Sequence, residues 1–105
     1  MTLYVVEYRY DEALSNLVSD FRPAHREHLR KLQADGKLVA SGFLRDSIFD
    51  GAMLIFRADS AQQAREYLDD DPFVTNGLIH SLLIREWHPT LGDMADDFDK
   101  AFPSS

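Results

Sequence analysis

Histidine and carboxylate side chains are the groups in this sequence best suited to catalysis. The chain contains no cysteine, which removes disulfides, thiolate nucleophiles and Cys-ligated zinc or iron–sulfur clusters together. No glycine-rich phosphate loop, nucleophile elbow or dinucleotide fingerprint occurs in the sequence, so nucleotide chemistry is not predicted. Among the four histidines, His25 differs from the others by its position.

His25 falls in the middle of an apolar stripe that repeats at helical spacing over residues 12–35. The apolar members of the stripe are Leu14, Leu17, Val18, Phe21, Leu29 and Leu32. An imidazole in that position is buried or lines a pocket, and it needs a hydrogen-bond partner. Two interpretations stay open: a core histidine with satisfied hydrogen bonds, and a general acid or base that transfers protons near neutral pH.

Pro23 lies two residues before His25, where the helix interior is expected. Proline is tolerated in the first turn of a helix or at a kink. We therefore expect either a second helix capped by Asp20 or a bend at Pro23. Both would place His25 near a helix N-terminus, where the helix dipole favours the neutral ring that a general base needs.

Three consecutive carboxylates, Asp69 to Asp71, precede Pro72 and Phe73. Asp69 and Asp70 are expected to belong to a solvated acidic loop. Asp71 differs, because Pro72 restricts the residue before it to extended geometry and Phe73 can anchor the turn in the core. An aspartate fixed in this way can orient an imidazole and set its tautomer. We therefore take His25 and Asp71 as candidate catalytic residues.

The other histidines carry weaker signals. His28 is one helical turn from His25, but two histidines are not a metal site and no third ligand stands at useful spacing, so no metal is predicted. His80 and His88 are expected to be structural.

Three arginines, Arg22, Arg26 and Arg30, form a row along the same expected helix. Such a row is usually a solvated face that pairs with neighbouring acids such as Glu27. Arg22 is close enough to His25 to steer an anionic substrate, so we include it among the candidate substrate-binding residues.

The elements that position these side chains follow from periodicity and turn chemistry. Residues 2–10 alternate as a strand, and residues 12–35 form a helix that stops at Gly36. Residues 37–44 and 52–58 are apolar runs joined by a turn at Asp50-Gly51, and residues 78–87 form the last strand. A capping box at Ser60 opens a second helix that ends near residue 68.

The resulting order, β-α-β-β-α-β, predicts an α+β ferredoxin-like fold with one four-stranded antiparallel sheet and both helices on one face. In the first strand, alternation places Leu3 and Val5 on one side, with Tyr4, Val6, Tyr8 and Tyr10 on the other. The second face of the sheet would remain uncovered. Its apolar candidates include Val6, Tyr8, Ile55 and Leu83, and an apolar open face usually means a partner. We therefore predict a homodimer whose open sheet faces stack.

Composition limits the function classes further. The chain has 105 residues, with 18 Asp and Glu against 11 Lys and Arg, for a formal charge of −7. Such a surface repels phosphate backbones, so neither nucleic acid nor a membrane surface is an expected partner. No apolar run approaches the length of a membrane span, and the charged first ten residues do not resemble a signal peptide. We expect a soluble, cytoplasmic domain over residues 1–88.

Residues 89–105 form an acidic C-terminal tail in this interpretation. Leu91, Met94, Phe98 and Phe102 are spaced three or four residues apart, so part of the tail could form a short amphipathic helix.

Several of these residues together resemble the YciI-like family, or YCII-related domain. The resemblance covers about residues 1–88 and rests on the R-x-x-H motif with its following segment and on the later D-P-F motif. The residues that carry it are Arg22, Pro23, Ala24, His25, Leu29, Leu32, Asp35, Gly36, Lys37, Leu38, Ser41, Gly42, Gly51, Ala64, Asp71, Pro72, Phe73, Gly77 and Trp87. One position departs from the family pattern: Gly42 is followed by Phe43, where the family often has proline.

The resemblance implies a dimeric α+β barrel and a His–Asp pair, here His25 and Asp71, that lines a pocket. It also implies that Ser41, Gly42 and Phe73 lie at a substrate-binding site. Most family members have no assigned reaction. One branch acts as a dehydrochlorinase on a chlorinated hydroxyquinol, by acid–base chemistry with this pair and without metal or cofactor.

Three function hypotheses follow. The first is a small cofactor-independent lyase or isomerase, in which His25 is the general base and Asp71 holds its ring, acting on a small aromatic or enolisable substrate. The alternative is a non-catalytic module of the same fold that binds a small molecule or assembles with a partner. A third hypothesis, an oxygenase-like member of the same barrel fold, would need a haem- or quinol-binding pocket.

Overall fold

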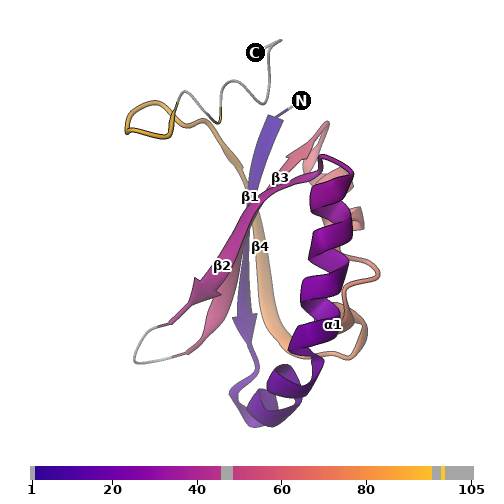
Figure 1. The fold of residues 1–105 in the computed structure, drawn as a ribbon. Coiled ribbons are helices and arrows are strands. Elements are labelled where there is room, and N and C mark those ends of the chain that lie inside the picture. Colours follow the sequence, from indigo (N-terminus) through magenta and orange to yellow (C-terminus); the bar gives the residue numbers. More distant parts are fainter. Residues whose placement is uncertain (1, 46–48, 96–97, 99–105) are drawn as a thin grey trace.

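The computed structural model describes residues 2–45, 49–95 and 98. Its strands are β1 (Thr2–Tyr10), β2 (Leu38–Leu44), β3 (Gly51–Ala58) and β4 (Ile79–Trp87). Its helices are the 3₁₀ turn η1 (Glu12–Leu14), α1 (Ser15–Ala34), α2 (Ala61–Glu66) and α3 (Pro72–Thr75). The strands pair antiparallel in the order β2-β3-β1-β4, and α1, α2 and α3 all lie on one face of the sheet (Figure 1). The predicted ferredoxin-like fold is confirmed.

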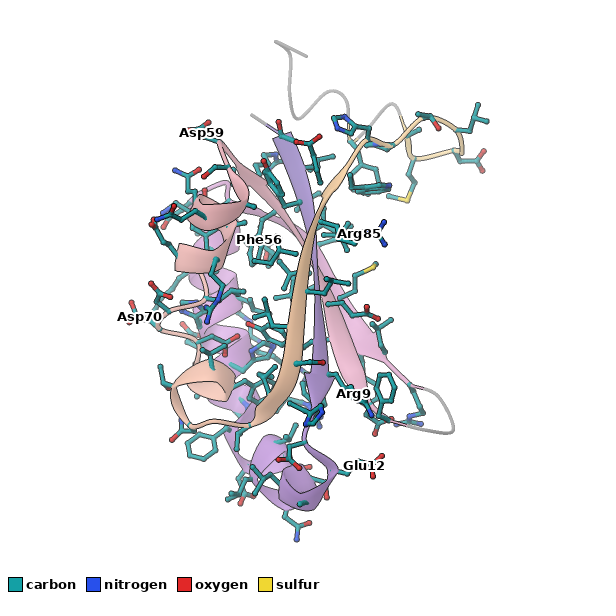
Figure 2. All side chains as sticks on the ribbon, turned by 180° about the vertical axis from the view of Figure 1, so that it is seen from behind. Arg9, Glu12, Phe56, Asp59, Asp70 and Arg85 are labelled. Carbon is teal, nitrogen blue, oxygen red and sulfur yellow. The ribbon has the colours of Figure 1, made fainter. Side chains whose placement is uncertain are left out.

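The central strand β1 divides its side chains between the two faces as its alternation predicts. Val6 and Tyr8 are fully buried and belong to the main core, together with Phe56 of β3 and Leu29 of α1. The expectation that Val6 and Tyr8 lie on the open face is therefore wrong, because the helices cover the side of β1 that carries its larger aromatic residues. Figure 2 shows the two sides of the sheet, with Phe56 toward the helices and Arg85 away from them.

The open face carries a smaller apolar cluster. Leu3 and Ile55 are buried there and pack with Val5, Val39 and Trp87. Further along the described sheet the apolar side chains are more exposed, with Met53 at 40% and Leu83 at 51%.

Helix α1 runs from Ser15 to Ala34 without interruption, and Pro23 lies inside it. The expected second helix capped by Asp20 is not found, because the residues on either side of Pro23 belong to one helix; His25 therefore lies in the helix interior and not near its N-terminus. Proline removes one backbone donor, and packing of the buried stripe on the sheet offsets that cost. Leu17 was predicted to belong to the buried stripe, but it is 43% exposed and does not join the core. Gly36, with φ of 76°, ends the helix as expected.

Close backbone packing explains the glycine at the start of β3. Gly51 pairs with Arg9 of β1, and a Cβ atom there would lie 1.9 Å from the Tyr8 carbonyl oxygen. The residue was predicted to belong to the turn, but it is the first residue of the strand. The turn itself falls partly on residues 46–48, outside the described residues.

The second helix begins as its capping box predicts. The backbone amide of Gln63 donates a hydrogen bond to the Ser60 hydroxyl at 3.0 Å. The side-chain oxygen of Gln63 accepts a hydrogen bond from the backbone amide of Asp59 at 2.7 Å. The helix ends at Glu66, shorter than expected, and turns lead to α3. No helix was predicted at α3, because a four-residue element is too short to show a period.

The C-terminal segment is described only in part. Phe98 packs against Trp87 at 5.0 Å between ring centroids, next to the apolar cluster of the open face. Leu91 and Met94 are exposed, at 93% and 62%. Phe102 lies outside the described residues, so the amphipathic helix stays a prediction. Among the described helices, none is both long and apolar enough to cross a membrane.

Candidate active site

His25 and Asp71 meet in the interior between α1 and the start of α3. The Nδ1 atom of His25 lies 2.8 Å from Oδ1 and 2.9 Å from Oδ2 of Asp71. Both residues are buried, at 5% and 0% exposure, although 46 residues separate them in the chain. Since an ionised carboxylate only accepts, Nδ1 carries the hydrogen and donates it to Asp71.

Three groups donate to the Asp71 carboxylate. Besides His25, the Tyr8 hydroxyl donates to Oδ2 at 2.9 Å and the Phe73 amide donates to Oδ1 at 3.0 Å. The last of these bonds makes Asp71 the N-cap of α3, with Pro72 at the first helical position. The φ and ψ angles of Asp71, −66° and 122°, are the extended geometry expected before proline. This set of donors stabilises a buried negative charge.

Two aromatic rings fix the imidazole. The Phe73 ring stacks on the His25 ring, with 4.0 Å between centroids and 9° between planes. The Tyr8 ring lies on another side at 6.3 Å. Burial raises the pKa of the Tyr8 hydroxyl far above its usual value, and the Asp71 charge adds to this effect, so Tyr8 stays a neutral donor. The ring of His25 is thus held against rotation.

A small cavity of about 130 Å³ opens beside His25, between α1 and the β2–β3 hairpin. Its lining comprises Tyr10, Arg22, His25, Arg26, Leu29, Ser41, Gly42, Phe43, Ala52 and Leu54. Among the described residues, no group hydrogen-bonds Nε2 of His25. One nitrogen of the ring is therefore occupied by Asp71, and the other remains for a ligand in the cavity.

The structure places the predicted site residues in two groups. Arg22, Ser41 and Gly42 line the cavity together with His25. Phe73 is fully buried and does not line it. The prediction that Phe73 lies at the substrate-binding site is therefore wrong for this cavity; its ring stacks on the ring of His25 instead.

A larger cavity of about 510 Å³ adjoins the first one. It does not reach His25, but it shares Tyr10, Arg22 and Phe43 with the smaller cavity. The remaining lining residues are Asp11, Glu12, Ser15, Val18, Ser19, Arg45, Phe49 and Asp50. Of the buried pair, His25 lines the smaller cavity, while Asp71 lines neither cavity and contacts it through the imidazole.

Tyr10 lies where the two cavities meet. Burial raises the pKa of its hydroxyl to about 12; the Arg22 cation opposes this rise, and the Asp71 carboxylate adds to it. The neutral hydroxyl can therefore donate or accept a hydrogen bond at the junction.

The remaining histidines have other roles. His28 Nε2 donates to the Tyr67 carbonyl at 2.8 Å and links α1 to the end of α2. His88 contacts Glu86 at 2.7 Å on the surface, and His80 is exposed. Within the described part of the chain, no group of three potential metal ligands comes together.

Sequence reasoning missed Tyr8, Tyr10 and Arg45. Strand alternation places both tyrosines on the same side of β1 as Val6. Their position near the site could therefore be predicted once it is known that the helices cover this side. Arg45 follows the end of β2 in a loop, where no periodicity indicates a direction.

Comparison with known proteins agrees with this fold. The YCII-related domain matches residues 2–88 of the chain. No curated protein matches it. Among solved structures, 5-chloro-2-hydroxyhydroquinone dehydrochlorinase from Burkholderia phenoliruptrix AC1100, in complex with 2,5-dihydroxybenzoquinone, is similar at 22% identity and a TM-score of 0.71. That alignment covers 81% of this chain and 92% of the dehydrochlorinase.

Two further structures are similar in fold, both at 10% identity. An antibiotic biosynthesis monooxygenase aligns with a TM-score of 0.55 over 87% of this chain and 100% of its own. A protein from Arabidopsis thaliana aligns with a TM-score of 0.52 over 89% and 99%. The architecture is thus that of dimeric α+β barrel structures, and identities this low carry the fold alone.

Proposed function

This chain belongs to the YCII-related domain family, and from that premise we propose that it is a small enzyme that uses His25 as a general base. The observation that carries the proposal is the buried pair, with Nδ1 of His25 within 2.9 Å of both Asp71 oxygens and His25 on the wall of a cavity. Asp71 fixes the tautomer and stabilises the imidazolium that forms when Nε2 takes a proton.

The chemistry that this arrangement supports is lyase or isomerase chemistry on a small, aromatic or enolisable substrate. Nε2 removes a proton from carbon, and the electrons of the broken C–H bond form a new double bond. In a lyase, a leaving group such as chloride departs from the adjacent carbon with its electron pair. In an isomerase, the imidazolium returns the proton to another carbon. His25 and Asp71 suffice for both proton transfers, so the proposal invokes neither a metal nor a cofactor.

The proposal is tested with chlorinated hydroxyhydroquinones, the substrate class named for the similar dehydrochlorinase, and with enolisable carbonyl compounds in deuterated water. Chloride release or deuterium uptake is the readout. His25→Gln and Asp71→Asn should each lower the rate by about 10²–10⁴, the usual contribution of a general base. Asp70→Asn is the matched control, because Asp70 is adjacent in sequence but exposed. Turnover that is undiminished in both variants would contradict the assignment.

The alternative is a binding module without catalysis. It is favoured by one observation: Asp71 already caps α3 and anchors Tyr8, which is a sufficient structural reason for its burial. NMR of the His25 ring protons separates a catalytic imidazole from one that serves packing alone. A ring whose signals respond to ligand, and respond differently in Asp71→Asn, supports the enzyme; a ring unaffected by pH and ligand supports the packing role.

We also propose that a second copy covers the open sheet face. The described helices pack on one side only, and the other side exposes Met53 and Leu83 beside the cluster of Leu3 and Ile55. Exposed apolar area of this kind marks an interaction site. Light scattering should then give twice the chain mass of 12.0 kDa at micromolar concentration; a monomer would contradict the proposal. Cytoplasmic localisation and a domain boundary after residue 88 complete the proposal.

A further inference from the structure

Two arginines flank one aromatic ring where the two cavities join. The guanidinium carbon of Arg22 lies 5.4 Å from the centroid of the Phe43 ring, and that of Arg45 lies 5.2 Å from the same centroid. Arg22 and Phe43 line both cavities, whereas Arg45 lines only the larger one. Phe43 is 44% exposed, so the ring is a wall of the cavity system and not part of the core. We call these three residues the arginine cluster.

The two guanidinium groups of this cluster are not neutralised within the described residues. The ion pairs found there involve His25, Arg30, Lys37, Arg65 and His88, and neither Arg22 nor Arg45 is a member. This is unexpected in a chain with 18 acidic residues and 11 Lys and Arg. Three acids also line the larger cavity, Asp11, Glu12 and Asp50, but among the described ion pairs none joins them to Arg22 or Arg45. The Asp11 side chain accepts a hydrogen bond from the Ala13 amide at 3.0 Å.

We propose that the larger cavity binds the anionic end of an elongated aryl carboxylate, held by Arg22 and Arg45, while its other end lies at His25. A guanidinium presents paired donors that match a carboxylate. Phe43, Phe49 and Tyr10 give the same cavity aromatic walls, against which an aryl ring packs well. The inference names the substrate class for the proposed function and rests on it for the reaction at His25.

The sizes of the two cavities agree with this division. The smaller cavity, about 130 Å³, has room for little more than a reacting group, whereas the larger one is about 510 Å³. Small-molecule sites usually have volumes of about 300–1,000 Å³. Tyr10, Arg22 and Phe43 belong to both linings, so the two cavities are adjacent, as a ligand that occupies both requires.

The test uses hydrocinnamate and its neutral amide as probes, with affinity measured by isothermal titration calorimetry. Hydrocinnamate should bind wild type more tightly than the amide does. Arg45→Gln should weaken hydrocinnamate binding by about tenfold, the loss expected for one charge-assisted contact, and leave amide binding unchanged. Arg30→Gln is the matched control, because Arg30 lies on the exposed side of α1 and pairs with Glu27.

Three results would overturn the inference: equal affinity for hydrocinnamate and the amide, wild-type affinity in Arg45→Gln, or no hydrocinnamate binding at millimolar concentration. NMR mapping adds a positional check, since the largest shifts should fall on Ser19, Phe43 and Phe49. His25→Gln separates this inference from the proposed function. It should lose turnover on the substrates of the proposed function but still prefer hydrocinnamate to the amide, because that preference depends on Arg45. A failure of catalysis therefore leaves the binding result unaffected.

Discussion

The Asp71 network reaches the smaller cavity only through His25, whereas the arginine cluster lines the cavities directly, and the two are held in opposite ways. Asp71 is fully buried and accepts from His25, Tyr8 and the Phe73 amide at 2.8–3.0 Å. Phe43 is 44% exposed, and its arginine neighbours lie more than 5 Å from its ring centroid. In the proposed function this difference separates two tasks: the network fixes the direction of proton transfer, and a looser rim accommodates the remainder of a substrate.

The first prediction removes the centre of the rigid region. Asp71→Ala leaves the Tyr8 hydroxyl, His25 Nδ1 and the Phe73 amide without their acceptor in the interior. Breaking a buried charged network in this way should lower the free energy of unfolding by about 3–5 kcal/mol. Urea denaturation followed by circular dichroism measures the change.

The control for this experiment is the neighbouring carboxylate. Asp70 is exposed and projects outward from the helix side of the molecule (Figure 2). Asp70→Ala should therefore change the free energy of unfolding by no more than about 0.5 kcal/mol. If the two substitutions cost the same, Asp71 is not the centre of a buried network, and the contrast between the two regions is lost.

The rigid region was also the more predictable one. The burial of His25 can be predicted from the apolar residues around it in α1. The extended geometry of Asp71 can be predicted from Pro72, the next residue in the chain. The order of elements gave the fold for the same reason, because periodicity is a local property. The open-face assignment of Tyr8 failed, since alternation separates the two sides of a strand without saying which side the helices cover.

Pro23 shows a second limit. Its local preference favours a break, but burial of Val18, His25, Leu29 and Leu32 on one continuous helix outweighs it. Such a balance between local and tertiary terms cannot be judged from the sequence around the proline alone. The arginine cluster was unpredictable for another reason: it joins α1 to the end of the β2–β3 hairpin, and its geometry depends on how that hairpin approaches the helix.

The second prediction concerns Tyr10, which lies between the two regions. The pKa of its hydroxyl rises from 10.0 to about 12 in the folded chain. Between these values the unfolded chain loses the proton while the folded chain keeps it. The stabilisation is therefore complete below pH 10 and is lost as pH rises toward 12, a loss of about 2–3 kcal/mol. Unfolding measured across this pH range should show the decline, and Tyr10→Phe should reduce it.

Variants of each region should move the Tyr10 pKa in opposite directions. Arg22 lowers it and Asp71 raises it. Arg22→Gln should therefore shift the tyrosinate absorbance of Tyr10 to higher pH, and Asp71→Asn should shift it to lower pH. Shifts of the same sign would show that the two regions do not act separately on the residue between them.

The third prediction has the smallest effect and is the sharpest test of the comparison. If the arginine cluster serves binding and contributes little to folding, Arg45→Gln should cost no more than about 0.5–1 kcal/mol, the value of an exposed cation–π contact. Arg30→Gln, on the exposed side of α1, gives the baseline for loss of a surface arginine. Urea denaturation of both variants measures the difference.

A loss of stability comparable to that of Asp71→Ala would mean that the hairpin is held to α1 through Arg45. The cluster would then belong to the rigid part of the site. A small loss of stability together with a large loss of carboxylate affinity is the combination expected of a rim shaped by ligand recognition, because a side chain that folding does not need is free to be selected for what it binds.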